Sequence, residues 1–320
     1  MKILVVGGTG LLGGDAALLL QSEGHEVTIG ARKPAPEHSA MAAMPHLFGD
    51  YMESGYSVDE LKGFDGVIFT AGSDVRHVNE GVSEEAHWRR ANAEATPAFF
   101  ERVRDAGVPR AVLLGSFYPQ AAPELVGKVP YVTGRADADN AVRALASDSF
   151  SVSSVNPPYV IGMLPGLIVP AFMAYTSYAL GMLPFPAFAP AGGANFISTG
   201  SLSRALATAI VRGESGKPYL VGDENLSFRA YLEAYFAAAG NPQTLPVLDQ
   251  EHPLFPDSIL YAGRGGTIFF EPDEDERTFL GYQRGRIRST IEEIVASCRP
   301  MIEAAKAHLS PGPSEGPNAS

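Results

Sequence analysis

The sequence predicts an α/β fold, a doubly wound parallel sheet with a smaller C-terminal cap. Short apolar runs rich in β-branched residues alternate along the chain with longer segments of helical character. Alternation at this spacing is typical of parallel βαβ units. The first apolar run, residues 2–6, ends at a glycine-rich turn that leads directly into an apolar helical segment, residues 11–20. The chain therefore begins with a βαβ unit.

The turn between the first strand and the first helix predicts a Rossmann-type cofactor site. Gly7, Gly10 and Gly13 follow a GxxGxxG spacing, and Gly8, Gly10 and Gly13 fit the alternative GxGxxG spacing. We prefer the first because the apolar strand ends at Gly7. A strand that turns on glycines into a helix exposes free N–H groups and the positive end of the helix dipole, which suits a diphosphate. A glycine-rich turn without a ligand is the alternative.

Composition limits the possible partners. The 320 residues carry a formal net charge of −12, which argues against nucleic acid or an anionic membrane as the main partner. Cys298 is the only cysteine, so no intrachain disulfide or cysteine-based metal site is expected. The acidic run at 271–276 is a poor metal site, and we expect no metal. No signal peptide is visible, so the expected location is the cytoplasm.

The remaining elements follow the same alternation. Strands are expected at 26–30, 46–50, 66–72, 110–116, 150–155, 195–199 and 219–222, and helices at 82–106, 132–145, 202–211, 228–239 and 289–308. We assign residues 1–155 and a returning segment, 195–222, to the dinucleotide-binding domain. Residues 156–194 and 223–309 then form a substrate-binding cap. The tail, 310–320, is rich in Pro, Gly and Ser and is expected to be disordered.

The end of the second strand indicates which dinucleotide binds. NAD sites of this kind usually carry a carboxylate there, which binds the adenosine ribose hydroxyls. Here the residues are Gly30, Ala31, Arg32 and Lys33. A 2′-phosphate would be attracted by Arg32, so the sequence favours NADP(H). Two solvated surface cations are the alternative.

A long charge-free stretch bears on the substrate. Residues 150–203 contain no Asp, Glu, Lys, Arg or His. Prolines leave only residues 171–183 uninterrupted, too few for a membrane span, so no integral membrane insertion is expected. If this stretch lines the substrate site, the substrate is apolar or aromatic. We interpret the uninterrupted part as a buried or pocket-lining helix. A simple core, a dimer interface and peripheral membrane contact are the alternatives.

Several segments, in order from residue 1 to about residue 300, resemble the extended and atypical short-chain dehydrogenase/reductase family, which includes NAD-dependent epimerases and dehydratases. They are ILVVGGTGLLG (3–13), GDYMES (49–54), ANAEATPAFFERVRDAGVPRAVLLGS (91–116), PYVTGRADAD (130–139), NPPYVIG (156–162), GKPYLVGDENLSF (216–228) and LGYQRG (280–285). PYVTGRADAD resembles the active-site pattern PYxxSKxxxE of that family, and NPPYVIG resembles RPPxVYG.

The resemblance implies a cofactor site along the first half of the chain. Arg32 would bind the 2′-phosphate, Asp50 the adenine, and Asn92 would lie in the helix behind the site. The implied cofactor-binding residues are Gly7, Thr9, Gly10, Leu11, Leu12, Gly13, Arg32, Lys33, Asp50, Tyr51, Thr70, Ala71, Gly72, Asn92, Pro158, Tyr159 and Val160.

The resemblance also implies the catalytic residues. Tyr131 matches the catalytic tyrosine of the family, and Ser116 ends the strand that carries its Ser or Thr. The family places a Lys four residues after the tyrosine, where its charge stabilises phenolate. Here that residue is Arg135. Either Tyr131 acts as proton donor with Arg135 tuning it, or the standard chemistry is weakened or absent.

These features together predict an NADP(H)-dependent oxidoreductase that acts on a carbonyl or alcohol of a small, largely apolar substrate, with Tyr131 as general acid/base. A non-catalytic NADP(H)-binding sensor and a nucleotide-sugar epimerase or dehydratase are the alternatives. Homodimerisation through the two long helices is a family expectation.

Overall fold

The computed structural model describes residues 1–53, 55–72, 78 and 81–309, with the backbone alone at 307–309. The tail predicted to be disordered, 310–320, lies outside the described residues.

Seven parallel strands form the main sheet, in the order β10-β6-β5-β4-β1-β2-β3. Their bounds are β1 (Lys2–Val6), β2 (Glu26–Ala31), β3 (His46–Phe48), β4 (Gly66–Phe69), β5 (Arg110–Leu114), β6 (Ser151–Asn156) and β10 (Pro218–Leu220). The predicted doubly wound parallel sheet is therefore confirmed. The strand order reverses between β1 and β4, and ligands of such sheets bind at the carboxyl ends of the strands beside that point.

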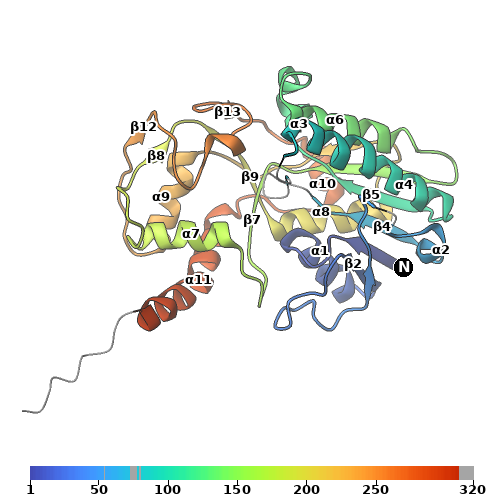
Figure 1. Cartoon of the computed structure of the whole chain (residues 1–320), viewed down its shortest axis with the longest axis horizontal. Helices are drawn as coiled ribbons and strands as arrows, with labels where there is room; N and C mark the ends of the chain where they lie inside the picture. The colour runs from blue at the N-terminus through green and yellow to red at the C-terminus, as the bar shows by residue number, and fades with distance from the viewer. Residues whose placement is uncertain (54, 73–77, 79–80, 310–320) are drawn as a thin grey trace, which may run out of the picture.

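Helices cover both faces of this sheet (Figure 1). On one face lie α1 (Leu11–Ser22), α8 (Thr199–Arg212) and α10 (Glu274–Leu280), and on the other α2 (Val58–Leu61), α3 (Glu84–Trp88), α4 (Ala95–Asp105) and α6 (Pro130–Arg143). Successive side chains of β1 enter two different cores, because side chains alternate across a strand. Ile3 and Val5 pack with α1 and α8, whereas Leu4 and Val6 pack with α4.

The cap is built on a second, four-stranded sheet of β7 (Tyr159–Ile161), β9 (Gly193–Ser198), β11 (Glu224–Ser227) and β13 (Thr267–Ile268). Its other elements are α7 (Pro170–Ala179), β8 (Ala189–Pro190), α9 (Phe228–Ala238), β12 (Val247–Leu248) and α11 (Ile287–Leu309). These elements enclose an aromatic core and lie to the left of the main sheet in Figure 1. Three single turns, α5 (Tyr118–Ala121), η3 (Pro123–Leu125) and η4 (Asp257–Ile259), complete the order.

Two of the expected elements differ clearly from the structure. In the returning segment 195–222, α8 packs on the main sheet and β10 is one of its strands. The first strand of the segment, β9, instead pairs with the cap strands β7 and β11. The helix expected at 82–106 begins at Glu84 and is interrupted by a π-helix, η2 (Arg89–Glu94). Just after η2, the hydroxyl of Thr96 donates a hydrogen bond to the carbonyl of Ala91, five residues earlier. A π-helix has i→i+5 hydrogen bonds, so each of its turns holds more residues than a turn of an α-helix.

The charge-free stretch is mostly core. Its helix, α7, packs against α9 and α11 and buries Phe172, Tyr175 and Tyr178 in the cap. Within the described part of the chain, no helix combines the length and the apolar character that crossing a membrane requires.

Candidate functional site

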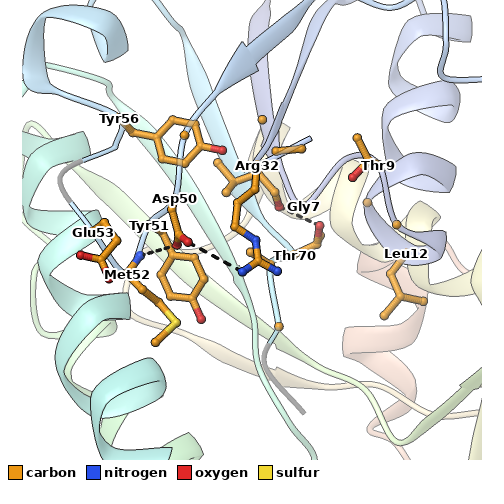
Figure 2. Close-up of a pocket in the computed structure, with 18 of the residues that line it drawn as sticks. Gly7, Thr9, Leu12, Arg32, Asp50, Tyr51, Met52, Glu53, Tyr56 and Thr70 are labelled. Atoms are coloured by element: carbon orange, nitrogen blue, oxygen red, sulfur yellow. Dashed lines mark hydrogen bonds and ion pairs between the residues drawn. The ribbon is translucent and has the colours of Figure 1, made fainter. Parts of the chain in front are cut away.

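A cavity of about 710 Å³ lies at the carboxyl ends of β1, β2 and β4 (Figure 2). Twelve of the sequence-predicted cofactor residues lie on its wall, namely Gly7, Thr9, Gly10, Leu11, Leu12, Gly13, Arg32, Asp50, Tyr51, Thr70, Ala71 and Gly72. The cavity thus occupies the place where the strand order reverses, and we call it the dinucleotide pocket after the cofactor that the sequence predicts.

Glycine is sterically required at three positions of the turn, Gly7, Gly8 and Gly13, of which Gly7 and Gly13 line the pocket. Gly7 has a φ of +87°, and a Cβ there would lie 2.6 Å from the backbone nitrogen of Ala71. At Gly13 a Cβ would lie 2.4 Å from Thr70 Oγ1 and 2.5 Å from the Gly7 carbonyl oxygen. The Thr70 hydroxyl is held there by donating to the Val6 carbonyl, at 2.8 Å. β1, the glycine turn and α1 therefore pack tightly against the end of β4. In this arrangement the first N–H groups of α1 face the pocket.

The end of the pocket beside β2 and β3 contains an ion pair that the sequence did not predict. Arg32 Nη1 lies 3.7 Å from Asp50 Oδ2, and Asp50 Oδ1 accepts a hydrogen bond from the Met52 backbone at 3.0 Å. The Arg32 side chain is 62% exposed, so a phosphate can reach it from the pocket. Lys33 is exposed and lies outside the pocket wall.

Other wall residues were missed by the sequence reasoning. Tyr56 follows Asp50 on the chain, and Arg90 lies on η2 across the pocket. Arg90 Nη2 donates to Glu53 Oε1 at 2.5 Å, which joins η2 to the segment after β3. Tyr51 packs edge-on against Phe69, and burial raises the pKa of Tyr51 to about 12. Tyr51 is one of the residues that the resemblance implied, whereas Glu53, Tyr56 and Arg90 were not expected.

The predicted catalytic tyrosine lies at the second residue of α6, outside the wall of the dinucleotide pocket. Its ring stacks on Tyr261 of the cap, with centroids 4.2 Å apart and an interplanar angle of 7°. Trp88 packs edge-on against the Tyr131 ring at 5.2 Å. Tyr131 is therefore positioned where the sheet domain meets the cap.

Arg135 and Ser116 lie at the carboxyl edge of β5. Arg135 Nη2 donates to the Leu114 carbonyl at 2.7 Å, and its Nε is buried without a hydrogen-bond partner among the described residues. Ser116, two residues after Leu114, is buried. Asn92 is buried in η2 beside Gly134 of α6, and its amide nitrogen has no partner in the described part of the chain. Asn92 thus packs against α6 and does not line the pocket.

A narrow hollow of about 10 Å³ lies between the cap and the end of β5. It is lined by Phe117, Tyr118, Tyr159, Gly193, Ala194, Phe228, Leu260, Ala262, Gly263, Gly266 and Ile268, none of which is charged. The hydroxyls of Tyr118 and Tyr159 lie 3.3 Å apart, and burial raises the pKa of both phenols. Pro158 and Val160 flank Tyr159 on β7 and its approach, outside both cavities.

Solved structures with this architecture include several nucleotide-sugar enzymes. A UDP-glucose 4-epimerase from Stenotrophomonas maltophila, solved with NAD and formylated UDP-arabinopyranose, is 17% identical with a TM-score of 0.74, covering 95% of this chain and 99% of its own. A nucleoside-diphosphate-sugar epimerase from Pseudomonas aeruginosa is 22% identical, with a TM-score of 0.70 and coverages of 94% and 98%. A short-chain dehydrogenase/reductase superfamily protein from Agrobacterium tumefaciens with bound NAD is 16% identical, with a TM-score of 0.69 and coverages of 96% and 100%.

Comparison of the sequence with models of protein families identifies the family of this chain. No curated protein matches the sequence. The family model described as the NAD dependent epimerase/dehydratase family matches residues 3–175, more than half of the chain. The match includes the glycine turn, Arg32, Asp50, Tyr131 and Arg135. The chain therefore belongs to the NAD-dependent epimerase/dehydratase family.

Proposed function

We propose that this protein is an NADP(H)-dependent oxidoreductase that interconverts a carbonyl and an alcohol on a small, uncharged and largely apolar substrate. The observation that carries the cofactor choice is the end of β2, where Arg32 faces the pocket and no carboxylate lies on that strand end. Asp50 lies near Arg32, but a single contact at 3.7 Å with a largely exposed guanidinium is a weak pair. A 2′-phosphate carries more charge and can displace it.

The cap side supports the substrate class. The hollow beside Tyr118 and Tyr159 is walled by aromatic, small and aliphatic residues without a single charge. A diphosphate substrate placed there would lose its hydration without gaining a cation, which is costly. A small apolar or aromatic carbonyl compound incurs no such cost. The hollow has to widen for such a compound to enter, because its present volume is below that of any organic substrate.

Three residues of this chain would perform the chemistry. When bound, the dinucleotide would supply or take up the hydride at its nicotinamide ring. In the reducing direction, the Tyr131 hydroxyl would give its proton to the oxygen that becomes the alcohol, and the Ser116 hydroxyl would donate a hydrogen bond to the same oxygen. Arg135, one helical turn after Tyr131, would provide the positive charge that the family supplies there with a Lys.

The test is hydride transfer by the purified protein. NADPH is mixed with a panel of small aldehydes and ketones, and reduced nicotinamide is followed by absorbance. We expect turnover that falls at least a hundredfold in Tyr131→Phe, since general acid catalysis contributes about that much or more. The Phe ring keeps the stack on Tyr261, so NADPH affinity should be unchanged. No turnover with any carbonyl, or an unaltered rate in Tyr131→Phe, would contradict the proposal.

Two other functions have an observation each in their favour. The similarity to nucleotide-sugar epimerases favours an epimerase or dehydratase; binding of a UDP-sugar in calorimetry would support that reading over ours. The fixed position of Arg135 on the Leu114 carbonyl favours a non-catalytic NADP(H) sensor. Tight NADPH binding without hydride transfer to any carbonyl would support the sensor.

A further inference from the structure

Tyr56 has a backbone conformation that side chains rarely adopt. Among the described residues it is the one non-glycine residue with a positive φ, at 61°. The left-handed region brings Cβ close to the following carbonyl and is unfavourable for a residue of this size. Such outliers cluster at ligand-binding sites, where the surrounding structure holds them in place.

The surroundings of Tyr56 are shaped to hold its ring. The residue is 1% exposed. A Cβ at Gly49 would lie 3.0 Å from three of its ring carbons, and a Cβ at Gly30 would lie 3.1 Å from its hydroxyl. Phe99 packs edge-on against the ring, with centroids 5.7 Å apart. Two glycines on the ends of β2 and β3 therefore make room for this one side chain.

The hydroxyl of Tyr56 has no hydrogen-bond partner among the described residues, although Tyr56 lines the dinucleotide pocket. Figure 2 shows the hydroxyl on the side of the ring that faces Arg32. The hydroxyl oxygen is not fully buried, so it is open to the pocket and can donate a hydrogen bond to a ligand bound there. Ring packing and backbone strain thus present an unused donor to the pocket.

We propose that the Tyr56 hydroxyl donates a hydrogen bond to the group on the 2′ oxygen of the adenosine ribose, a phosphate in NADP(H). The adenosine ribose of dinucleotides in such sheets lies at the end of the second strand, where Gly30 lies beside the Tyr56 hydroxyl and Arg32 follows two residues later. Burial raises the pKa of Tyr56, so the phenol stays protonated and remains a donor at neutral pH. Tyr56 and Arg32 would then bind the 2′-phosphate from two sides. This inference rests on the proposed NADP(H) use.

The test removes only the hydroxyl, in Tyr56→Phe. Calorimetric titration should show a Kd for NADPH about tenfold higher than in the wild type, and a Kd for NADH raised no more than threefold, because hydrogen bonds to charged acceptors are the stronger ones. The same contrast is expected between 2′,5′-ADP and 5′-ADP. Equal factors for the phosphorylated and plain ligands, or no change for either, would overturn the inference.

A stability measurement separates ligand contact from packing. Without nucleotide, Tyr56→Phe should melt at the wild-type temperature or above it, since the lost hydroxyl was unpaired. With saturating NADPH, the rise in melting temperature should be smaller than in the wild type. Tyr175→Phe, which removes a hydroxyl from a buried cap tyrosine far along the chain, is the control and should keep the full NADPH-induced rise. A full rise in Tyr56→Phe would contradict the inference.

The binding experiments distinguish failure of the proposed NADP(H) use from failure of the proposed Tyr56 contact. A wild-type protein that binds NADH but not NADPH would overturn the proposed cofactor; Tyr56→Phe would then be titrated with NADH, and an unchanged Kd would overturn the contact to the 2′ oxygen as well. A wild-type protein that binds NADPH, with identical binding by Tyr56→Phe, would overturn the inference alone. A wild-type protein that binds neither dinucleotide would overturn both.

Discussion

The guanidinium of Arg135 donates a hydrogen bond from Nη2 to the carbonyl oxygen of Leu114, at 2.7 Å. Leu114 is the last residue of β5, and Arg135 lies one turn after Tyr131 on α6. The contact ties the first half of α6 to the edge of the sheet. It also fixes the position of a positive charge that the family usually supplies with Lys. The guanidinium of Arg135 is thus held at the carboxyl end of β5.

Arg135→Lys should therefore lower activity and not restore it. A lysine ammonium is a point charge without the planar fork of arginine, so it cannot occupy the same position at Leu114. We expect kcat to fall about tenfold or more, equivalent to about 1.4 kcal/mol of transition-state stabilisation. Arg143→Lys, on the same helix but paired with Asp139, is the control and should keep wild-type kcat. A large gain of activity in Arg135→Lys would instead mean that the native site is degenerate.

Arg32 should determine the preference between the two dinucleotides. Arg32→Ala removes the cation at the end of β2, so the Kd for NADPH should rise tenfold or more, whereas the Kd for NADH should change little. The NADPH effect should shrink at high salt, because the Arg32 side chain is largely exposed. Fluorescence titration of both cofactors at two salt concentrations measures this. Arg104→Ala, at the end of α4 and paired with Asp105, is the control; equal effects of both substitutions would refute a specific role for Arg32.

Local sequence patterns predicted the sheet and the glycine turn, because both depend on residues close together in the chain. Alternation of strands and helices sets the parallel topology, and glycine spacing marks the turn at Gly7. The sheet that β9 joins could not be predicted in this way, because the apolar pattern of β9 fits either sheet. Which sheet it joins depends on pairing with β7 and β11.

Residues that depend on contacts between distant segments were also missed. Asp50 was assigned to the adenine from resemblance, but its proximity to Arg32 follows from the neighbouring positions of β2 and β3. Tyr56 carries no sequence signal, because its left-handed backbone and its packing beside Gly30 and Gly49 are visible only once three segments of the chain have come together. The π-helix that holds Asn92 likewise has no pattern that distinguishes it from an α-helix.

Gly13→Ala should damage both folding and binding. The new methyl would lie 2.4 Å from Thr70 Oγ1 and 2.5 Å from the Gly7 carbonyl oxygen, so α1 has to move away from the turn. We expect a loss of about 1–3 kcal/mol in the free energy of unfolding, typical of overpacking, together with loss of NADPH binding. Gly200→Ala, in α8 with no atom within 4 Å of the new methyl, should be neutral or slightly stabilising. Urea unfolding and calorimetry measure the two effects, and wild-type binding by Gly13→Ala would count against the pyrophosphate role of the turn.

His252 should make the stability of the cap depend on pH. The ring is fully buried among Tyr178, Phe188 and Phe255, and burial lowers its pKa to about 4. In the unfolded chain the pKa returns to its ordinary value, so between about pH 6.5 and pH 4 the unfolded state binds more protons than the folded state. The free energy of unfolding therefore falls as the pH is lowered through this window, by up to about 3 kcal/mol from this residue.

The contribution of His252 is isolated by comparing its variant with the wild type across that window. His252→Gln removes the titrating ring, so its free energy of unfolding should be lower at pH 7 but should fall less between pH 6.5 and pH 4. Urea unfolding at several pH values in this range gives both slopes, and the other carboxylates and histidines contribute equally to each. The difference between the slopes is therefore due to the buried imidazole, and parallel curves would show that His252 is as readily protonated in the folded protein as in the unfolded chain.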